Sequence, residues 1–387
     1  MPFTGRATYD PGAFEGVAED VSGLVSIISP FETPLLAALG DSQFPATNTL
    51  HEWVEDELSP NSLVLGGGIA ATGASATVGI NGGLARYVQV GALLQAPDAS
   101  IQAGQTTPEL MQITQIVGNT ITVTRAFAGT TQAALNSGDS LTVVADAALE
   151  GADVTMDTSR SRIRKGNYTM IFKKDVIVSG TVRSVNQLGG ISDEWDYQIQ
   201  KKLRENLRDL EKAVILSRLS GNTLGSASAI RTFAGLLQQI NTNNPTAAIN
   251  LTASTLTAEI KKAWDQGGTD IDLIVCGDKV KNVIDNFNDT RIQVVQGTGE
   301  DFRFRNLVSV FECTYGSLPL MLTRWMPPTR YMIVSTQRIA IAPLQGRSFQ
   351  FEEVARTGDS NKGMLLGEYT LEVRNEAGMV QGRISNP

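Results

Sequence analysis

The sequence predicts an α+β protein in which a β-rich insertion, one long helix and a mixed α/β region follow one another. Three patterns support this prediction. Apolar–polar alternation typical of half-buried strands recurs within residues 59–158, an apolar stripe with helical spacing follows residue 192, and helix and strand patterns alternate over residues 223–344. With 387 residues, the chain is long enough to form two or three hydrophobic cores.

Composition and charge narrow the classes of function. Hydrophobic residues make up 42% and charged residues 19% of the chain, as in ordinary soluble globular proteins. No apolar run approaches the roughly 20 residues that span a bilayer, and the N-terminus lacks a secretory signal. We therefore expect a cytosolic protein with no membrane partner. The net charge of −8 argues against a nucleic-acid-binding protein, because tight binding to phosphates needs clustered Lys and Arg.

The two cysteines predict no disulfide framework. Cys276 and Cys313 are far apart in the sequence and lie in apolar surroundings. Such thiols are typical of small buried side chains in a reducing compartment. A disulfide between them is the less favoured alternative.

The N-terminal region, residues 1–50, is expected to be an extended arm with small docking helices. The apolar residues within 21–28 are expected to form a short helix that Pro30 ends. A second helix is predicted at residues 34–39, because proline is tolerated in a first helical turn.

The β-rich insertion is predicted at residues 59–158, where the composition changes sharply. This stretch has no lysine, and its only arginines are Arg86 and Arg125. Gly, Ala, Thr, Asn and Gln dominate, and a Gly-Asn pair at 118–119 favours a turn before a strand. Strands are expected at residues 87–90, 110–117, 120–125 and 140–144.

A basic strand pair is predicted over residues 159–182. Its first strand carries the basic run 160–165, and the Gly-Asn pair at 166–167 is interpreted as the turn. Acidic residues are abundant elsewhere in the chain. We therefore expect this run to form salt bridges between subunits more readily than contacts with nucleic acid.

The strongest helix pattern follows this strand pair. Ser192 can cap its N-terminus, and the acidic residues Asp193 and Glu194 complement the positive end of the helix dipole. Apolar residues recur every three or four positions, at Trp195, Ile199, Leu203, Leu207, Leu210 and Val214. The helix is expected to run to Leu219, about 40 Å at about 1.5 Å per residue. Its narrow apolar stripe predicts a helix lying along another layer.

The remainder is predicted to be mixed. Helices are expected at residues 256–265 and 279–287, and strands at 271–276, 307–311, 318–322 and 331–334. The C-terminal segment then alternates apolar and polar residues, with Tyr369, Leu371 and Val373 on one face of a strand.

The sequence predicts no catalytic, cofactor-binding or metal-binding residue. His51 is the only histidine, and the following sequence to Glu55 resembles half of a zinc-protease motif whose second histidine is missing. Zinc needs three or four suitable ligands, so we interpret His51 as a polar strand residue near an interface. The glycine clusters 66–68 and 297–299 lack the Gly-Lys-Ser/Thr ending of a phosphate loop and are interpreted as flexible loops.

Other candidate features favour structural roles. Asp193, Glu194 and Asp196 are expected to interact with the helix dipole rather than form a catalytic carboxylate cluster. Three tryptophans fall at apolar periodic positions and are expected to pack in cores: Trp195, Trp264 and Trp325.

The order of these elements resembles the Hong Kong 97-type fold of tailed-bacteriophage major capsid proteins. More specifically, the segments 27–36, 51–53, 356–359 and 367–376 resemble the SU-ten-type phage major capsid family. They bracket nearly the whole chain. The resemblance implies an N-terminal arm, an extended E-loop hairpin with a β-rich insertion, a spine helix, an axial (A) domain and a peripheral (P) domain. Its expected boundaries are 1–50 for the arm, 51–182 for the E-loop region with the insertion at about 59–158, 183–222 for the spine helix, 223–344 for the A-domain and 345–387 for the closing P-domain strands.

The resemblance also implies a function. Copies would assemble into hexamers and pentamers of an icosahedral or prolate head around phage double-stranded DNA, with weak, non-specific contact to that DNA. Implied partners are a portal and separate scaffolding or decoration proteins, and the implied location is the virion, assembled in the host bacterial cytoplasm. No lysine near the hairpin is marked as reactive, so we expect a non-covalent shell. We also expect no enzymatic activity and no cofactor.

Three alternatives remain open from the sequence. The β insertion alone suggests a tail or decoration protein, which would form tubes, fibres or trimers. An encapsulin-like compartment shell would share the same fold. A hydrolase of unfamiliar type is disfavoured by the single histidine.

Overall fold

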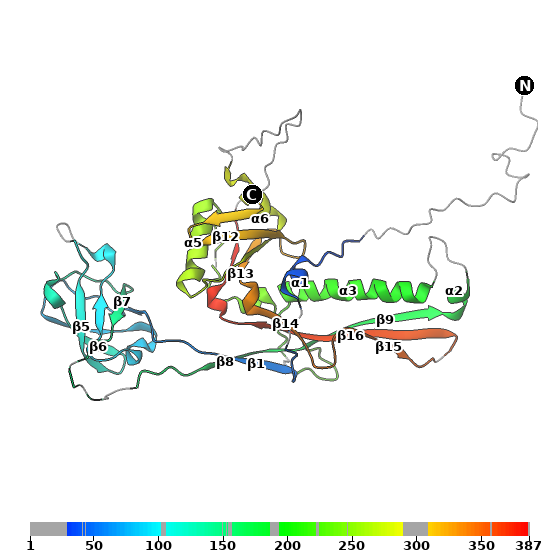
Figure 1. Cartoon of the computed structure of the whole chain (residues 1–387), viewed down its shortest axis with the longest axis horizontal. Coiled ribbons are helices and arrows are strands. Elements are labelled where there is room, and N and C mark those ends of the chain that lie inside the picture. The colour runs from blue at the N-terminus through cyan, green and yellow to red at the C-terminus, as the bar shows by residue number, and fades with distance from the viewer. Residues whose placement is uncertain are drawn as a thin grey trace, which may run out of the picture. The chain divides into compact units, whose positions relative to one another are not determined.

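The computed structural model describes residues 29–40, 42, 44–101, 106–148, 150–151, 153, 157–185, 193–221, 224–245, 247–288, 309–356 and 358–385. The chain forms two compact units with separate cores (Figure 1). The β unit is Val54–Arg164, and the main unit is Met1–Trp53 with Lys165–Pro387. The helix expected at 21–28 and the glycine cluster 297–299 lie outside the described residues.

The β unit contains one six-stranded antiparallel sheet. Its strand order is β2 (Ser62–Val64), β7 (Ser140–Ala145), β4 (Leu93–Gln95), β5 (Leu110–Val117), β6 (Thr120–Thr124) and β3 (Ser75–Gly79). The two end strands also meet, because Leu65 and Ile80, the residues that follow β2 and β3, form an antiparallel bridge. The Gly66 N–H donates to Gly79 O at 2.8 Å beside it. The sheet therefore closes on itself at this end, which shortens its unpaired edges.

The strand predictions for the β unit succeed where the strands are long. β5, β6 and β7 are confirmed, and the Gly-Asn pair at 118–119 connects β5 to β6. The strand predicted at 87–90 is wrong. A 3₁₀ segment, Asn81–Tyr87, ends there, and only Val88 of the following run is fully buried. β2 and β4 have three residues each, too few to show an alternating pattern.

A buried ion pair joins three segments of the β unit. Glu109 and Arg125 are 0% and 3% exposed, and their side chains form two hydrogen bonds, of 2.6 Å and 2.5 Å. Backbone N–H groups of Ala126 and Ala133 also donate to the carboxylate, and Arg125 donates to Ala70 O and Ala133 O. Burial opposes the charged form, but Arg125 and the two N–H donors outweigh it and hold the pKa of Glu109 below its usual value.

In the main unit, a long strand organises one sheet. β16 (Ser360–Val373) pairs with β14 (Ile339–Pro343) and β15 (Gln350–Val354) and, on its other side, with β9 (Met170–Ser179), all antiparallel. Helix α3 (Glu194–Leu216) lies along β9 and β16 (Figure 1). Its buried residues Leu210, Val214 and Ile215 share a core with residues of β9, β14 and β16. The predicted helix lying along a second layer is confirmed.

The ends of α3 differ from the prediction. Asp193 is the N-cap and accepts a hydrogen bond from Trp195 N–H at 2.9 Å, while Ser192 lies outside the described residues. Glu194 and Asp196 lie in the first turn, as predicted for helix-dipole partners. The helix ends at Leu216 rather than Leu219, because the chain packs back on its last turn. The Ser217 hydroxyl donates to Phe233 O at 2.8 Å, and Gly235 N–H donates to Ser217 O.

A five-stranded sheet completes the main unit. Its order is β11 (Val310–Cys313), β12 (Gly316–Leu322), β10 (Leu273–Cys276), β13 (Arg330–Val334) and β17 (Val380–Arg383); β10 and β12 are parallel and the other pairs antiparallel. Helices α5 (Ala253–Asp265) and α6 (Asp278–Asp285) pack with it. Every residue of β10 is buried, because alternate side chains enter two different cores. The helices and strands predicted here are confirmed with shifted ends, except that residues 307–308 are outside the described part.

The hairpin predicted at 159–182 is wrong in its pairing. Gly166 and Asn167 lie inside β8 (Ile163–Tyr168), which pairs with β1 (Leu50–Glu55), whereas β9 pairs with β16. A Cβ at Gly166 would lie 3.1 Å from His51 O, so glycine permits this close strand contact. The buried Asn167 amide donates to Ala234 O and Leu371 O, and its oxygen accepts from Ala234 N–H. Tertiary hydrogen bonds thus replace the turn.

The described helices include none with the length and apolar character needed to cross a membrane.

We predict that Glu109→Gln destabilises the β unit by about 3–5 kcal/mol, because it leaves a buried guanidinium without its carboxylate. Since the pKa of Glu109 is lowered in the folded protein, the stabilisation is present above its unfolded value near 4.5 and is lost as the pH falls. The unfolding temperature measured from pH 5 down to pH 3 should therefore fall more steeply in the wild type than in the variant.

Glu57→Gln is the matched control. Glu57 pairs with Arg160 in the same unit, but its side chain is 56% exposed, so the expected loss is near zero and at most about 1 kcal/mol. Equal losses in the two variants would contradict the structural role of the buried pair.

Candidate assembly surfaces

The histidine has a structural partner. His51 Nε2 lies 2.9 Å from Glu372 Oε2, which ties β1 to β16. The hydrogen bond from His51, together with Arg374, holds the pKa of Glu372 below its usual value against the effect of burial. No cluster of three potential metal ligands occurs within the described ranges. His51 is a strand residue as predicted, and its place near an interface stays a prediction.

Both cysteines are free thiols, so the disulfide alternative is wrong. Cys276 is buried in β10, and burial raises its pKa to about 12, which keeps the thiol protonated and unreactive. Cys313 is half-buried in β11.

The tryptophan predictions hold for two of three positions. Trp195 is buried against Phe351, with ring centroids 5.7 Å apart, and Trp325 packs half-buried against the main core. Trp264 is 48% exposed, so its predicted core position is wrong. Its helix buries Leu256, Ile260 and Ala263 instead, which leaves Trp264 beside the buried stripe.

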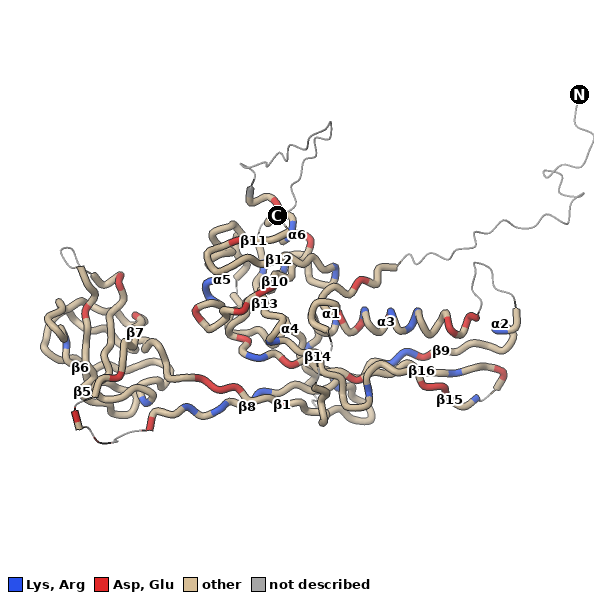
Figure 2. The backbone as a smooth tube through the Cα atoms, viewed as in Figure 1, with Lys and Arg blue, Asp and Glu red and all other residues tan. Residues whose placement is uncertain are grey.

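The basic run contacts its own chain. Arg160 forms an ion pair with Glu57, and Arg162 Nε lies 3.4 Å from Asp56 Oδ2. The expected salt bridges between subunits stay a prediction for this run. Figure 2 shows acidic and basic residues interleaved along α3, whereas β1 carries acidic residues and β8 carries basic ones. The described surface of α3 is therefore of mixed charge, and it differs from the clustered basic face of nucleic-acid-binding proteins.

An N-terminal strap, residues 29–40, is fastened to α3. It contains helix α1 (Pro34–Leu39), whose first N–H groups, at Leu35 and Leu36, donate to the buried carboxylate of Glu211 at 3.1 and 2.9 Å. Burial raises the pKa of Glu211, and the two N–H groups oppose that shift. The strap thus provides hydrogen-bond donors for a buried carboxylate on the packed face of α3.

The strap also contacts the segment before β13. Trp325 Nε1 donates to Glu32 O at 2.9 Å, and Arg324 Nε lies 3.2 Å from the Glu32 carboxylate. On the other side, the Arg204 guanidinium lies over the Phe31 ring at 5.3 Å. The strap therefore links α3 with the five-stranded sheet.

The sheet face opposite α3 carries uncovered apolar side chains. Along β9, Phe172, Val176 and Val178 point toward α3 and are buried, whereas Ile171 and Ile177 are 49% and 65% exposed. Ile171 also borders a cavity of about 470 Å³ with two more exposed apolar residues, Leu224 and Ile230. Ile171, Leu224 and Ile230 thus surround one hollow, and contiguous exposed apolar patches are where proteins bind other proteins.

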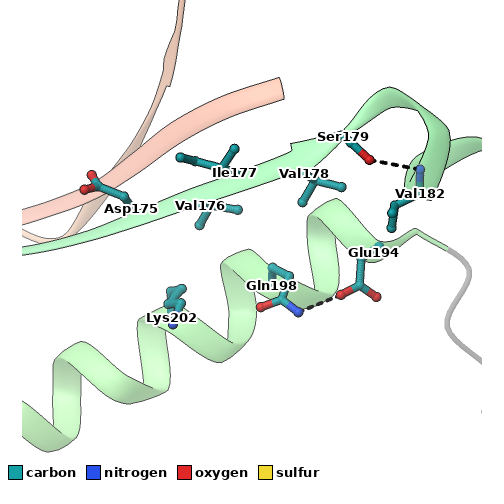
Figure 3. Close-up of a pocket in the computed structure, with 9 residues that line it drawn as sticks. All are labelled: Asp175, Val176, Ile177, Val178, Ser179, Val182, Glu194, Gln198 and Lys202. Carbon is teal, nitrogen blue, oxygen red and sulfur yellow. Dashed lines mark hydrogen bonds between the residues drawn. The ribbon is translucent and has the colours of Figure 1, made fainter. Parts of the chain in front are cut away.

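A shallow groove lies between α3 and β9 (Figure 3). Its volume is about 250 Å³, and Val176 and Val178 form its apolar side. Gln198 donates to Glu194 at 2.6 Å on the helix side, and Ser179 accepts from Val182 N–H. These polar groups form hydrogen bonds within the chain. We therefore interpret the groove as a surface for contact and not as a catalytic site.

Comparison with solved structures identifies the class of fold. The capsid asymmetric unit of cyanophage A-1(L) is similar with a TM-score of 0.54 and 11% identity, over 96% of this chain and 98% of that one. The capsid of a native GTA particle is similar with a TM-score of 0.50 and 8% identity, over 99% of this chain and 100% of that one. A SrpI encapsulin from Synechococcus elongatus covers 58% of this chain and 77% of its own, with a TM-score of 0.41 and 10% identity, and supports no argument.

The architecture is that of the Hong Kong 97-type fold of phage capsid proteins. The family described as SU10 major capsid protein matches residues 4–383, and the chain belongs to that family. It is therefore a structural protein of the virion that forms a capsid shell, and not an enzyme. No curated protein matches the chain.

We predict that Glu211→Ala detaches the strap, because Leu35 and Leu36 lose their acceptor and are left as unpaired buried donors, at a cost of about 1–3 kcal/mol. Limited proteolysis should cut within residues 29–40 at least several-fold faster than in the wild type. Glu205→Ala removes a partly exposed carboxylate of the same helix, which pairs with Lys202. This variant should leave the cleavage rate unchanged. Equal rates in all three proteins would contradict the anchoring role.

Proposed function

We propose that copies of this chain assemble into hexamers and pentamers that form the icosahedral or prolate head enclosing phage double-stranded DNA. The observation that carries this proposal is a well-packed main unit whose surface keeps several apolar side chains exposed. α3 and both sheets share one core, while Ile171, Ile177, Leu224 and Ile230 remain exposed in the single chain. Contacts with other copies would bury these side chains.

The proposed roles of the parts follow the expected boundaries. Residues 223–344 act as the A-domain around the centre of each hexamer or pentamer. The spine helix region 183–222 and the closing strands 345–387 form the P-domain, and the arm 1–50 reaches an adjacent copy. The E-loop region 51–182, with its insertion at about 59–158, reaches another. Individual contacts can be weak, because each copy makes several of them at once.

The charge of the chain supports a shell that encloses DNA without binding it tightly. The net charge is −8, and acidic and basic residues alternate along α3 (Figure 2). A wall of this kind would contact packaged DNA only weakly and non-specifically. The remaining partners we propose are a portal and separate scaffolding or decoration proteins, with assembly in the host bacterial cytoplasm.

We predict that the full chain, overproduced in bacteria, forms closed particles visible by negative-stain electron microscopy. Reconstruction of these particles should show six-fold and five-fold clusters of one subunit. Tubes, fibres or isolated trimers would support the tail or decoration alternative, and a chain that stays monomeric with and without a co-expressed scaffold would contradict the proposal.

A further inference from the structure

Strand β9 leaves one edge of its sheet open. Its pairing with β16 continues one residue further, where Gly180 N–H donates to Asp359 O at 3.2 Å. Because backbone groups of successive residues in an antiparallel pair point to opposite sides, the even-numbered residues of β9 bond to β16 and the odd-numbered ones point away from it. No strand pairs with that outer side within the described part of the chain. The edge is ten residues long and has no proline and no shift in its register.

The outer side is in use only just before β9 begins. Thr169 N–H donates to Thr49 O at 2.9 Å, and Thr169 O accepts from Arg231 Nε at 2.7 Å. From residue 171 to residue 177, the outward N–H and C=O groups have no backbone partner among the described residues. A long, straight edge of this kind is a template for pairing with another chain. The partner that would satisfy its backbone groups is an extended strand.

We propose that this strand is β9 of a second copy, paired antiparallel about Lys174. The four outward residues are Ile171, Lys173, Asp175 and Ile177, and this pattern complements itself when it is read in the opposite direction. Ile171 lies opposite the partner's Ile177, and Lys173 lies opposite the partner's Asp175. All four belong to hydrogen-bonded pairs in this register, because their backbone groups point outward.

Other registers of the same two strands are unfavourable. A shift of two residues in one direction puts Lys173 opposite the partner's Lys173, and a shift in the other direction puts Asp175 opposite the partner's Asp175. Like charges directly opposite one another destabilise a strand pair. Within one copy, Lys173 and Asp175 already form an exposed ion pair at 3.2 Å. The choice of occupant therefore rests on the open backbone edge, on the apolar pairs and on the avoidance of like charges, and not on a net attraction.

The same register covers the exposed apolar side chains of this sheet face. Ile177 is exposed and points away from α3 (Figure 3). The partner's Ile177 lies beside Ile171, at the hollow that Ile171 shares with Leu224 and Ile230. One contact thus covers all four exposed apolar residues in each copy. Such a contact has a two-fold axis, and an icosahedral head contains two-fold axes. This inference rests on the proposed assembly and assigns residues to a contact across one of those axes.

The first test is disulfide formation in particles of the full chain. Lys174 would lie opposite the partner's Lys174, with Cα atoms about 4.5 Å apart, which is within the range of a disulfide. Lys174→Cys, in a Cys313→Ser background that leaves only the buried Cys276, should give dimers on non-reducing denaturing gels after mild oxidation. Ser179→Cys is the control, because it would lie roughly 30 Å from its counterpart. Dimers no more abundant in Lys174→Cys than in this control would overturn the proposal.

The second test separates contacts between copies from those within one chain. Lys173→Asp and Asp175→Lys each put like charges opposite one another, and each alone should lower particle yield at least tenfold while the free subunit unfolds at the wild-type temperature. Co-expression of the two variants should restore most of the yield, because the acidic positions of one then face the basic positions of the other. Each variant still carries like charges within its own chain, so a role confined to one chain would not be rescued.

The outcomes distinguish this contact from the proposed function. Normal particle yield in Asp175→Lys, or no recovery on co-expression, would overturn the β9 contact and leave the capsid function intact. A wild-type chain that forms no particles would overturn the proposed function as well.

Discussion

The pairing of β9 with β16 is the constraint on which the main unit depends. It joins Met170–Ser179 to residues 360–369 in one continuous antiparallel register, and it thereby places the buried side of β9 under α3. A glycine of β16 permits tight packing on this sheet, because a Cβ at Gly363 would lie 2.3 Å from the Phe351 ring. The buried Glu368 fastens the end of the ladder through Thr169 and Arg231, at 2.6 and 2.5 Å. Segments far apart in the sequence therefore fold as one layer.

The β unit does not depend on that layer for its core. Its apolar residues form their own cluster, and the buried pair of Glu109 and Arg125 is satisfied by groups inside the unit. This explains why the composition changes so sharply near residue 59: a small closed sheet can use Gly, Thr and Asn at turns and outer positions without lysine. The main unit, in contrast, shares one core between α3 and two sheets. Such a core holds the surface patches of each copy in fixed positions, as a protein whose activity is assembly requires.

Much of the fold could be predicted from the sequence because local patterns agreed with the tertiary structure. α3, α5 and β5 are long enough to show their periodicity, and β10 reads as a continuous apolar run because both its faces are buried. The failures have tertiary causes. Gly166 and Asn167 look like a turn, but hydrogen bonds from Asn167 to distant backbone groups hold them in a strand. Trp264 fits the helical spacing, yet it lies beside the buried stripe. No local pattern could indicate that Glu211 would accept hydrogen bonds from a helix more than 170 residues earlier.

The central claim is that assembly joins copies through their outer surfaces while the packed layer of α3, β9 and β16 stays unchanged. Hydrogen exchange of backbone amides, measured by mass spectrometry on free subunits and on assembled particles, tests it most directly. Amides of β16, of the β9 residues that bond to β16 and of the second half of α3 should be strongly protected in both states, with new protection on assembly confined to surface segments. Rapid exchange of these amides in the free subunit, followed by protection only in the particle, would contradict the claim.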